Sequence, residues 1–237
     1  MITATKKLTA PNIATWIIVP AKPLSKAKSR LANILTPQAR QNLAFHLLDH
    51  TLQILDLLQK SLTNIKVLLV SSDPFLLRLA EKYRLYTFVD TNFDYENDSN
   101  ARLNKALTQA AQLCATYTDT KSLLVLPADL PFLEVDDLLF LLKQATELPN
   151  EKQIIISPDR AQVGTNALFV QPATLAGFDF QFGHASFAAH LEQATNINVP
   201  ATQILNRPGL LFDLDDTDDF YSLPADLQQQ LLAPVDF

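Results

Sequence analysis

The stretch SLLVLPADLP, residues 122–131, decides the fold class, because a short aliphatic run leads through a proline into a carboxylate, Asp129. A continuous apolar run bounded by turn residues is typical of a strand buried on both faces of a parallel sheet. Similar runs alternate along the chain with segments of helical periodicity. We expect strands at 16–19, 65–70, 86–89, 122–126 and 154–156, and helices at 37–58, 75–83, 101–115 and 135–147. This alternation predicts an α/β fold with a mainly parallel sheet and helices on both faces.

The second half of the chain departs from this alternation. Residues 157–190 carry several turn signals and short strand candidates, including 167–170, so we expect an irregular insert beside the sheet. A short helix at 186–194, a late strand at 210–212 and a closing helix at 224–232 should follow. With no linker to divide the chain, we expect a flexible N-terminus at 1–12 and a single domain at 13–237.

Composition narrows the class of protein. The chain has 237 residues, of which 48% are hydrophobic and 19% charged, so it can bury a sizeable core. Its net charge of -6 argues against a general nucleic-acid partner, which would need a basic face. A single cysteine, Cys114, is expected to be a buried helix residue, and it fits a reducing compartment. Since neither a signal peptide nor a membrane span is recognisable, we expect a cytoplasmic protein without a membrane partner.

The loop after the first predicted strand is rich in cations. It reads AKPLSKAKSRL at residues 21–31 and carries Lys22, Lys26, Lys28 and Arg30 in an otherwise acidic protein. Ligands of open parallel sheets bind beyond the carboxyl ends of the strands, where this basic loop (residues 21–31) falls. Lysine binds phosphate as a point charge and arginine as a bidentate fork. The basic loop is therefore a candidate phosphate site, with a solvated charged loop as the alternative.

Carboxylates follow two of the predicted strands. Asp129 comes directly after the central strand, and FDLDDTDD, residues 212–219, follows the late one. Hard oxygen ligands suit Mg²⁺, which usually takes one or two protein carboxylates with waters and phosphates. Alternation in an extended segment places Asp213 and Asp215 on the same side, so either could complete a magnesium site with Asp129. The alternative is that Asp129 caps a turn and the later acids begin a helix.

Two of the chain's four glycines lie in the irregular segment. Gly164 precedes Thr165, and Gly183 lies shortly before Ser186, where a helix should start. Glycine allows close approach of a ligand or a positive φ, and the N–H groups of a helix N-terminus bind anions. The segment is a candidate site for a phosphate or carboxylate group, and ordinary turn chemistry with Ser186 as an N-cap is an equal alternative.

Six segments, which cover roughly residues 15–220, occur in the order known from one protein family. They are VPAKPLSKAKSRL, RLNKAL, LPADLP, SPDRAQVGTNALF, FDFQFGHASFAAHLEQA and FDLDD. With these segments the chain resembles the 2-phospho-L-lactate guanylyltransferase family of coenzyme F420 biosynthesis, also described as phosphoenolpyruvate guanylyltransferases. The resemblance implies a three-layer Rossmann-like nucleotidyltransferase fold with an inserted β-hairpin region.

On the nucleotide side, the resemblance implies that GTP is the donor of a GMP unit. Lys22, Lys28 and Arg30 look like the catalytic loop that holds the GTP phosphates, and Asn104, in RLNKAL, looks like a nucleotide contact. On this reading the cations would screen the repulsion between two anionic reactants.

On the metal and acceptor side, Asp129 looks like the main Mg²⁺ ligand and Asp215 is similar to the second. Thr165, Gly183 and Ser186 look like contacts to the phosphorylated acid. The implied acceptor is 2-phospho-L-lactate, phosphoenolpyruvate or 3-phosphoglycerate, and pyrophosphate would be released.

The chain departs from the family pattern at three places. Arg102 stands where the family often has glycine, His184-Ala185 replaces a common Pro-Gly, and Asp216-Thr217 replaces Thr-Pro. The second departure touches the implied acceptor pocket, and the third concerns the choice between Asp213 and Asp215 as metal ligand.

Two other functions stay open from the residues. A molybdenum-cofactor cytidylyl- or guanylyltransferase would share the fold, but such enzymes typically carry a glycine-rich first loop, which this chain lacks. A non-catalytic nucleotide-binding protein is the alternative from another class, and the acidic metal candidates argue against it. The sequence makes no prediction of oligomeric state.

Overall fold

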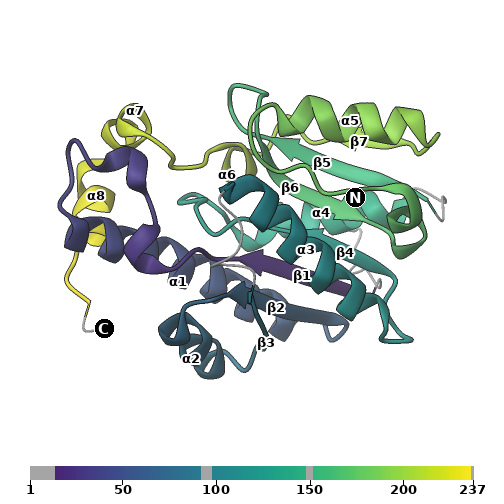
Figure 1. The fold of residues 1–237 in the computed structure, drawn as a ribbon, viewed down its shortest axis with the longest axis horizontal. Coiled ribbons are helices and arrows are strands. Elements are labelled where there is room, and N and C mark those ends of the chain that lie inside the picture. The colour runs from purple at the N-terminus through teal and green to yellow at the C-terminus, as the bar shows by residue number, and fades with distance from the viewer. Residues whose placement is uncertain (1–13, 92–97, 148–151, 236–237) are drawn as a thin grey trace, which may run out of the picture.

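A seven-stranded sheet forms the centre of the protein (Figure 1). The structure is a computed structural model and describes residues 14–91, 98–147 and 152–235, so the predicted flexible N-terminus lies outside the described residues. The strand order is β3-β2-β1-β4-β6-β5-β7. The strands are β1 (Thr15–Pro20), β2 (Ile65–Ser71), β3 (Tyr86–Val89), β4 (Ser122–Val125), β5 (Ile154–Pro158), β6 (Thr165–Val170) and β7 (Ala201–Gln203).

The sheet is parallel except at β6. β1 pairs in parallel with β2 and β4, β2 with β3, and β5 with β7, whereas β6 runs antiparallel between β4 and β5. The five predicted strands are confirmed. The strand candidate at 167–170 is also a strand, but the expectation that it lies beside the sheet is wrong. All of β6 is buried, because it fills the gap between two central strands.

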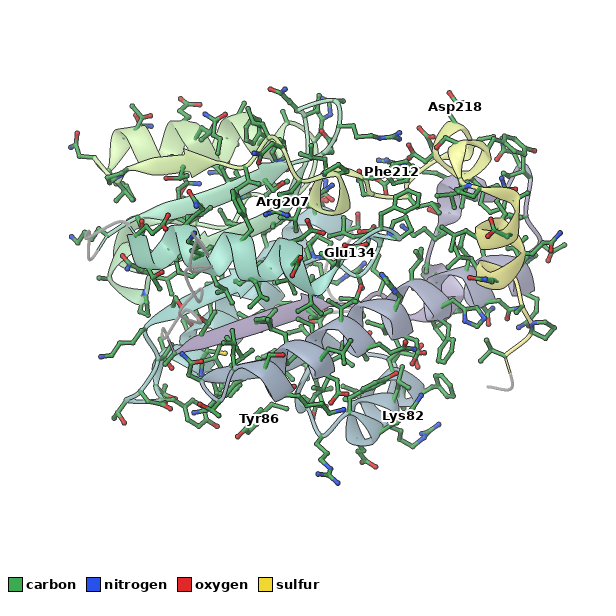
Figure 2. All side chains as sticks on the ribbon, turned by 180° about the vertical axis from the view of Figure 1, so that it is seen from behind. Lys82, Tyr86, Glu134, Arg207, Phe212 and Asp218 are labelled. Carbon is green, nitrogen blue, oxygen red and sulfur yellow. The ribbon has the colours of Figure 1, made fainter. Side chains whose placement is uncertain are left out.

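Helices cover both faces, as predicted. They are α1 (Pro37–Ser61), α2 (Pro74–Lys82), α3 (Ser99–Ala115), α4 (Val135–Glu147), α5 (Ser186–Asn196), α6 (Pro208–Leu211), α7 (Thr217–Ser222) and α8 (Ala225–Leu231), with short 3₁₀ turns at Leu24–Lys26, Ser29–Leu31 and Pro172–Gly177. α1, α2 and α4 pack on one face, and α3 and α5 on the other (Figures 1 and 2). Among the described helices, none has the length and apolarity that crossing a bilayer requires.

The longest helix, α1, begins where the sequence predicts. The Thr36 side chain accepts a hydrogen bond from the Ala39 N–H at 3.2 Å, and Pro37 occupies the first turn, where its missing N–H costs nothing. Leucines at helical spacing then bury one stripe of the helix against the sheet, from Leu48 to Leu58.

Besides the two cores on the faces of the sheet, a smaller hydrophobic cluster joins the start of α1 to the C-terminal helices. Leu31, at the end of the basic loop, packs with Leu43 and Leu47 of α1 and with Leu214 and Phe220 from the acidic segment. Figure 1 shows α7 and α8 beside the start of α1. This packing brings the basic loop and the acidic segment together although they are far apart in sequence.

The predicted late strand at 210–212 is wrong, because residues 208–211 form the helical turn α6. Pro208 occupies the first position of this turn, where proline is favoured. The periodicity of three apolar residues is too short to distinguish a strand from a buried helical turn. The acids nevertheless reach the sheet, since the Leu214 N–H donates to the Asp129 carbonyl at 3.0 Å. Arg160 also stacks on Phe212 at 3.9 Å, just before α7 (Figure 2 labels Phe212).

Candidate active site

A cleft of about 630 Å³ opens at the carboxyl ends of β1, β2 and β4, where β6 begins. This volume lies in the range of small-molecule sites. Its lining combines the basic loop, the loop after β4, the first turns of α3 and α5, and the acidic segment. The predicted site residues that line it are Lys22, Lys28, Arg30, Asp129, Thr165, Gly183, Ser186 and Asp215. Asn104 is not among the lining residues.

The basic loop is held over the end of β1 by the loop that follows β2. Asp73 accepts a hydrogen bond from the Leu24 N–H at 3.0 Å with one carboxylate oxygen, and from the Phe75 N–H at 2.9 Å with the other. The same carboxylate therefore caps α2 and fixes the first turn of the basic loop. Further along, Lys28 takes a left-handed conformation (φ 49°, ψ 40°), which turns the chain between two 3₁₀ turns.

The Lys28 ammonium group links the two predicted metal ligands. Its Nζ donates to Asp129 Oδ2 at 2.9 Å and to the Leu214 carbonyl at 2.6 Å, and it lies 3.6 Å from Asp215 Oδ1. Arg30 Nη1 donates to the other Asp215 oxygen at 3.0 Å. Both cations thus contact carboxylates, while Lys22 is exposed on the cleft wall.

Electrostatics keep Lys28 charged although its side chain is only 10% exposed. Burial alone would lower the pKa of Lys28, but the carboxylates of Asp129 and Asp215 outweigh it, so the pKa is raised. The site therefore combines a fixed positive charge with acidic groups that face the same point.

Asp213 lies in a different environment from Asp215. Its Oδ1 accepts from Asn166 Nδ2 at 3.3 Å. Burial, followed by the charges of Asp129 and Asp215, raises the pKa of Asp213 to about 7. Asp129, Asp213 and Asp215 therefore repel one another, and a cation nearby would relieve this repulsion.

The oxygen atoms present suit Mg²⁺. In the described part of the chain, no group of three or more acidic, histidine or cysteine side chains could hold a metal by itself. Two carboxylates, Asp129 and Asp215, meet at one ammonium group. Such a pair is what Mg²⁺ uses when waters and substrate phosphates complete its shell.

Across the cleft, Thr165, Ser186 and His190 form a buried polar chain. Ser186 Oγ donates to Thr165 Oγ1 at 3.1 Å, and His190 Nδ1 lies 3.1 Å from the same threonine oxygen. Thr165 begins β6 and Ser186 begins α5, so a strand and a helix together place two hydroxyl groups at the cleft.

The start of α5 differs from the sequence-based expectation. Ser186 is not the N-cap; that position is Ala185, which has a left-handed conformation (φ 56°) and makes no side-chain cap. The Ser186 N–H donates to the Gly183 carbonyl at 3.3 Å and the Phe187 N–H to the Val163 carbonyl at 3.1 Å. These two amides are occupied within the protein, so on this side of the cleft the hydroxyl groups are the better candidates to bind a ligand.

Asn104 binds protein backbone in this structure. Its Oδ1 accepts from the Phe182 N–H at 2.8 Å and its Nδ2 donates to the Phe182 carbonyl at 3.0 Å. Gly183 follows with φ 135°, and a Cβ there would lie 2.6 Å from Asn100 Nδ2. α3 thus holds the segment that leads into α5, and glycine allows the close approach.

Sequence reasoning missed several groups that shape the site. Asp159 accepts from the Val163 and Gly164 N–H groups at 2.8 and 2.9 Å, closing the turn that precedes Thr165. Asn166 and His190 were given no role either. Both belong to segments that carry the family resemblance, SPDRAQVGTNALF and FDFQFGHASFAAHLEQA, but a segment gives no hydrogen-bond partner for its members.

Known proteins resemble this chain in sequence and in fold. A phosphoenolpyruvate guanylyltransferase from Rubrobacter xylanophilus is 35% identical over 213 residues, covering 90% of this chain and 95% of that one. A 2-phospho-L-lactate guanylyltransferase from Methanobrevibacter ruminantium is 31% identical and covers 76% of this chain and 72% of its own length. The solved structure of a cytidylyltransferase from Leptospira borgpetersenii superposes with a TM-score of 0.56 at 12% identity, over 88% of this chain and 84% of that one, which shows a common fold.

The model of one family, described as guanylyl transferase CofC like, matches residues 15–224. The match takes in the basic loop, Asp129, the Thr165–Ser186 region and the acidic segment. The chain therefore belongs to this guanylyltransferase family and is a nucleotidyltransferase enzyme.

Proposed function

We propose that the protein transfers the GMP unit of GTP to a small phosphorylated carboxylic acid, releasing pyrophosphate, as a step of coenzyme F420 biosynthesis. One observation supports this proposal above the others. The basic loop, the Asp129–Asp215 pair and the Thr165–Ser186 hydroxyl groups line a single cleft. Two anionic reactants can therefore lie side by side, with cations between them.

In the proposed reaction, an oxygen of the acceptor phosphate attacks the α-phosphorus of GTP. The new bond joins this oxygen to the α-phosphorus, and the bond from the α-phosphorus to the bridging oxygen of the β-phosphate breaks. The electron pair leaves with pyrophosphate. Because the nucleophile is already anionic near neutral pH, positioning and charge neutralisation supply most of the catalysis.

The nucleotide phosphates would lie against the basic loop. Lys22 is exposed on the cleft wall and can bind a phosphate oxygen directly. Lys28 and Arg30 would contribute positive charge from their places beside the carboxylates. Asn104 would not touch the nucleotide; it would act indirectly on the acceptor side, through the segment that it clamps between α3 and α5.

Asp129 and Asp215 would hold Mg²⁺. When bound, the ion would neutralise charge on the phosphates of both reactants. Lys28 already lies between the two carboxylates, and its positive charge reduces their repulsion.

The acceptor would lie on the opposite side, with Thr165, Ser186 and the Gly183 backbone as its contacts. Phosphoenolpyruvate, 2-phospho-L-lactate and 3-phosphoglycerate share a phosphate and a carboxylate at close spacing, so all three belong to the proposed class. We place phosphoenolpyruvate first, since the Rubrobacter xylanophilus relative carries that name.

A cytoplasmic location is part of the proposal. Cys114 is buried in α3, and burial raises the pKa of its thiol to about 12, so it stays a protonated structural residue. A chain whose only cysteine is protected in this way needs no disulfide, which fits a reducing compartment.

The test is a screen of pyrophosphate release with Mg²⁺, four nucleoside triphosphates and the three acids. We expect release only when GTP and one of the acids are both present. Release with CTP, and none with GTP, would favour a different nucleotidyltransferase, and GTP binding without any release would favour a non-catalytic nucleotide-binding protein.

A further inference from the structure

His190 joins the acceptor side of the cleft through a chain of hydrogen bonds. Its Nε2 accepts from the Gln181 N–H at 3.0 Å, and its Nδ1 lies 3.1 Å from Thr165 Oγ1. Ser186 Oγ donates to that same oxygen. His190 is 0% exposed, and Thr165 and Ser186 are 6% and 1% exposed, so water does not compete for the hydrogen bonds among these three side chains.

The Gln181 amide settles which ring nitrogen carries the proton. A backbone N–H can only donate, so Nε2 of His190 must be its unprotonated acceptor. In a neutral imidazole the proton is then on Nδ1, which donates to Thr165 Oγ1. The ring is thereby fixed in one tautomer by two partners from different parts of the chain.

Aromatic side chains hold the ring in this orientation. Phe178 stacks on His190 with centroids 5.7 Å apart, and Phe182 meets it edge-on at 5.1 Å. Burial lowers the pKa of His190 to about 4, so the ring is neutral throughout the physiological range. The imidazole thus behaves as a fixed donor rather than as a group that titrates.

The Thr165 hydroxyl group keeps one hydrogen that can still be donated. A hydroxyl group has two acceptor lone pairs and one donor hydrogen. His190 Nδ1–H and Ser186 Oγ–H fill the acceptor positions, and among the described residues no acceptor is bonded to the hydrogen. Since Thr165 lines the cleft, this hydrogen is available to a ligand there.

We propose that His190 is a positioning residue, which makes the Thr165 hydroxyl an obligatory hydrogen-bond donor to an anionic oxygen of the acceptor. This inference rests on the proposed function, since it takes a phosphate or carboxylate as the group that Thr165 binds. His190 does not touch the reactants. Its Nδ1–H occupies one acceptor position of the Thr165 hydroxyl, so that this hydroxyl cannot accept a hydrogen bond from a ligand and can only donate one. The pocket therefore selects an anion over a neutral donor group.

Two substitutions separate the donor of His190 from its acceptor. In His190→Asn the amide nitrogen takes the place of Nδ1 and keeps the donor toward Thr165. In His190→Gln the amide oxygen takes the place of Nε2, which keeps the acceptor for the Gln181 N–H but loses the donor. Both remove the same ring from the Phe178–Phe182 pair, so each controls for the other's effect on packing.

We expect the KM for phosphoenolpyruvate to rise about tenfold in His190→Gln and about twofold in His190→Asn, as the loss of one buried hydrogen bond implies. The KM for GTP should not change in either variant. Equal KM values for phosphoenolpyruvate in the two variants would overturn the inference while leaving the proposed function intact. A wild-type protein that makes no product with any of the acids would instead overturn the proposed function, and the role in acceptor binding with it.

The tautomer can be measured without turnover. The ¹⁵N chemical shifts of the imidazole in wild-type protein should show a proton on Nδ1 and none on Nε2, unchanged between pH 6 and pH 8. A proton on Nε2, or a ring that titrates in this range, would overturn the inference even if both variants failed to fold.

Discussion

Asp129→Asn changes the centre of the site while preserving its shape. The carboxylate of Asp129 accepts the 2.9 Å hydrogen bond from Lys28 Nζ, and the asparagine Oδ1 can accept the same bond. Lys28 keeps the Leu214 carbonyl at 2.6 Å and the nearby Asp215. The substitution therefore removes one negative charge and leaves the hydrogen-bond pattern in place.

The expected loss of stability is small and the expected loss of activity is large. Weakening one charge-assisted hydrogen bond of a partly exposed carboxylate costs about 1 to 2 kcal/mol, which a fold of typical stability tolerates. A metal ligand contributes to the transition state, and removal of about 4 kcal/mol of such stabilisation lowers kcat about 10³-fold. We therefore expect a folded protein that is almost inactive.

The assay is pyrophosphate release with GTP, phosphoenolpyruvate and a range of Mg²⁺ concentrations, alongside thermal unfolding. Asp218→Asn is the matched control, because it removes the same charge from an exposed position on α7, away from the cleft (Figure 2 labels Asp218). The control should keep wild-type activity. If Asp129→Asn stayed within tenfold of wild type at every Mg²⁺ concentration, the assignment of Asp129 to the metal would be refuted.

Three further predictions test other parts of the structure. Ala185→Gly should stabilise the fold by about 0.5 kcal/mol in chemical denaturation, because glycine adopts the left-handed conformation at the start of α5 without strain. Ala189→Gly, inside the same helix, should instead cost about 1 kcal/mol. Equal losses in the two variants would contradict this explanation. Asn104→Ala should cost about 1 to 3 kcal/mol and raise the acceptor KM more than the GTP KM, since the Phe182 backbone loses both of its bonds; a rise confined to GTP would show a direct nucleotide contact instead. Because the pKa of His190 is lowered in the folded protein, the unfolded chain binds a proton on this ring at a higher pH than the folded protein does. The free energy of unfolding should therefore fall by up to about 3 kcal/mol as pH drops from about 6.5 to 4. Unfolding measured over this pH range should show the decrease in the wild-type protein and not in His190→Asn.

The parallel half of the fold could be predicted because its signals are local and repeated. α4 begins and ends at the predicted residues, and α1 begins at its predicted cap and proline. The apolar strands β1, β2 and β4 are buried on both faces, so their composition alone identifies them. The carboxyl ends of these strands then fix where the basic loop and Asp129 must meet.

The remaining features depend on contacts that a linear pattern does not encode. β6 reads as a short apolar run whether it lies in the sheet or beside it, and only its pairing with β4 and β5 decides between them. The same ambiguity explains why a strand was predicted where the structure has the helical turn α6. Long-range packing, rather than local propensity, chooses in both cases.

Within the site, the type of each residue predicted where it lies more accurately than it predicted which groups it contacts. The cations were expected to meet phosphates, yet Lys28 and Arg30 contact carboxylates that lie more than 100 and 180 positions away in sequence. Asn104 was expected at the nucleotide and binds the Phe182 backbone. His190 lies in a segment that carries the family resemblance, but its role depends on the tautomer that Gln181 imposes, which the sequence does not show.

The most direct measurement is the mass of the product formed from GTP and phosphoenolpyruvate labelled with ¹⁸O in its phosphate. If the two reactants meet in the cleft as proposed, the product will contain one GMP unit joined to the acid, with all of the label retained, and unlabelled pyrophosphate will accumulate in equal amount. Absence of this product from active, folded protein with each of the three acids, or transfer of the label into pyrophosphate, would contradict the proposed attack by the acceptor phosphate on the α-phosphorus.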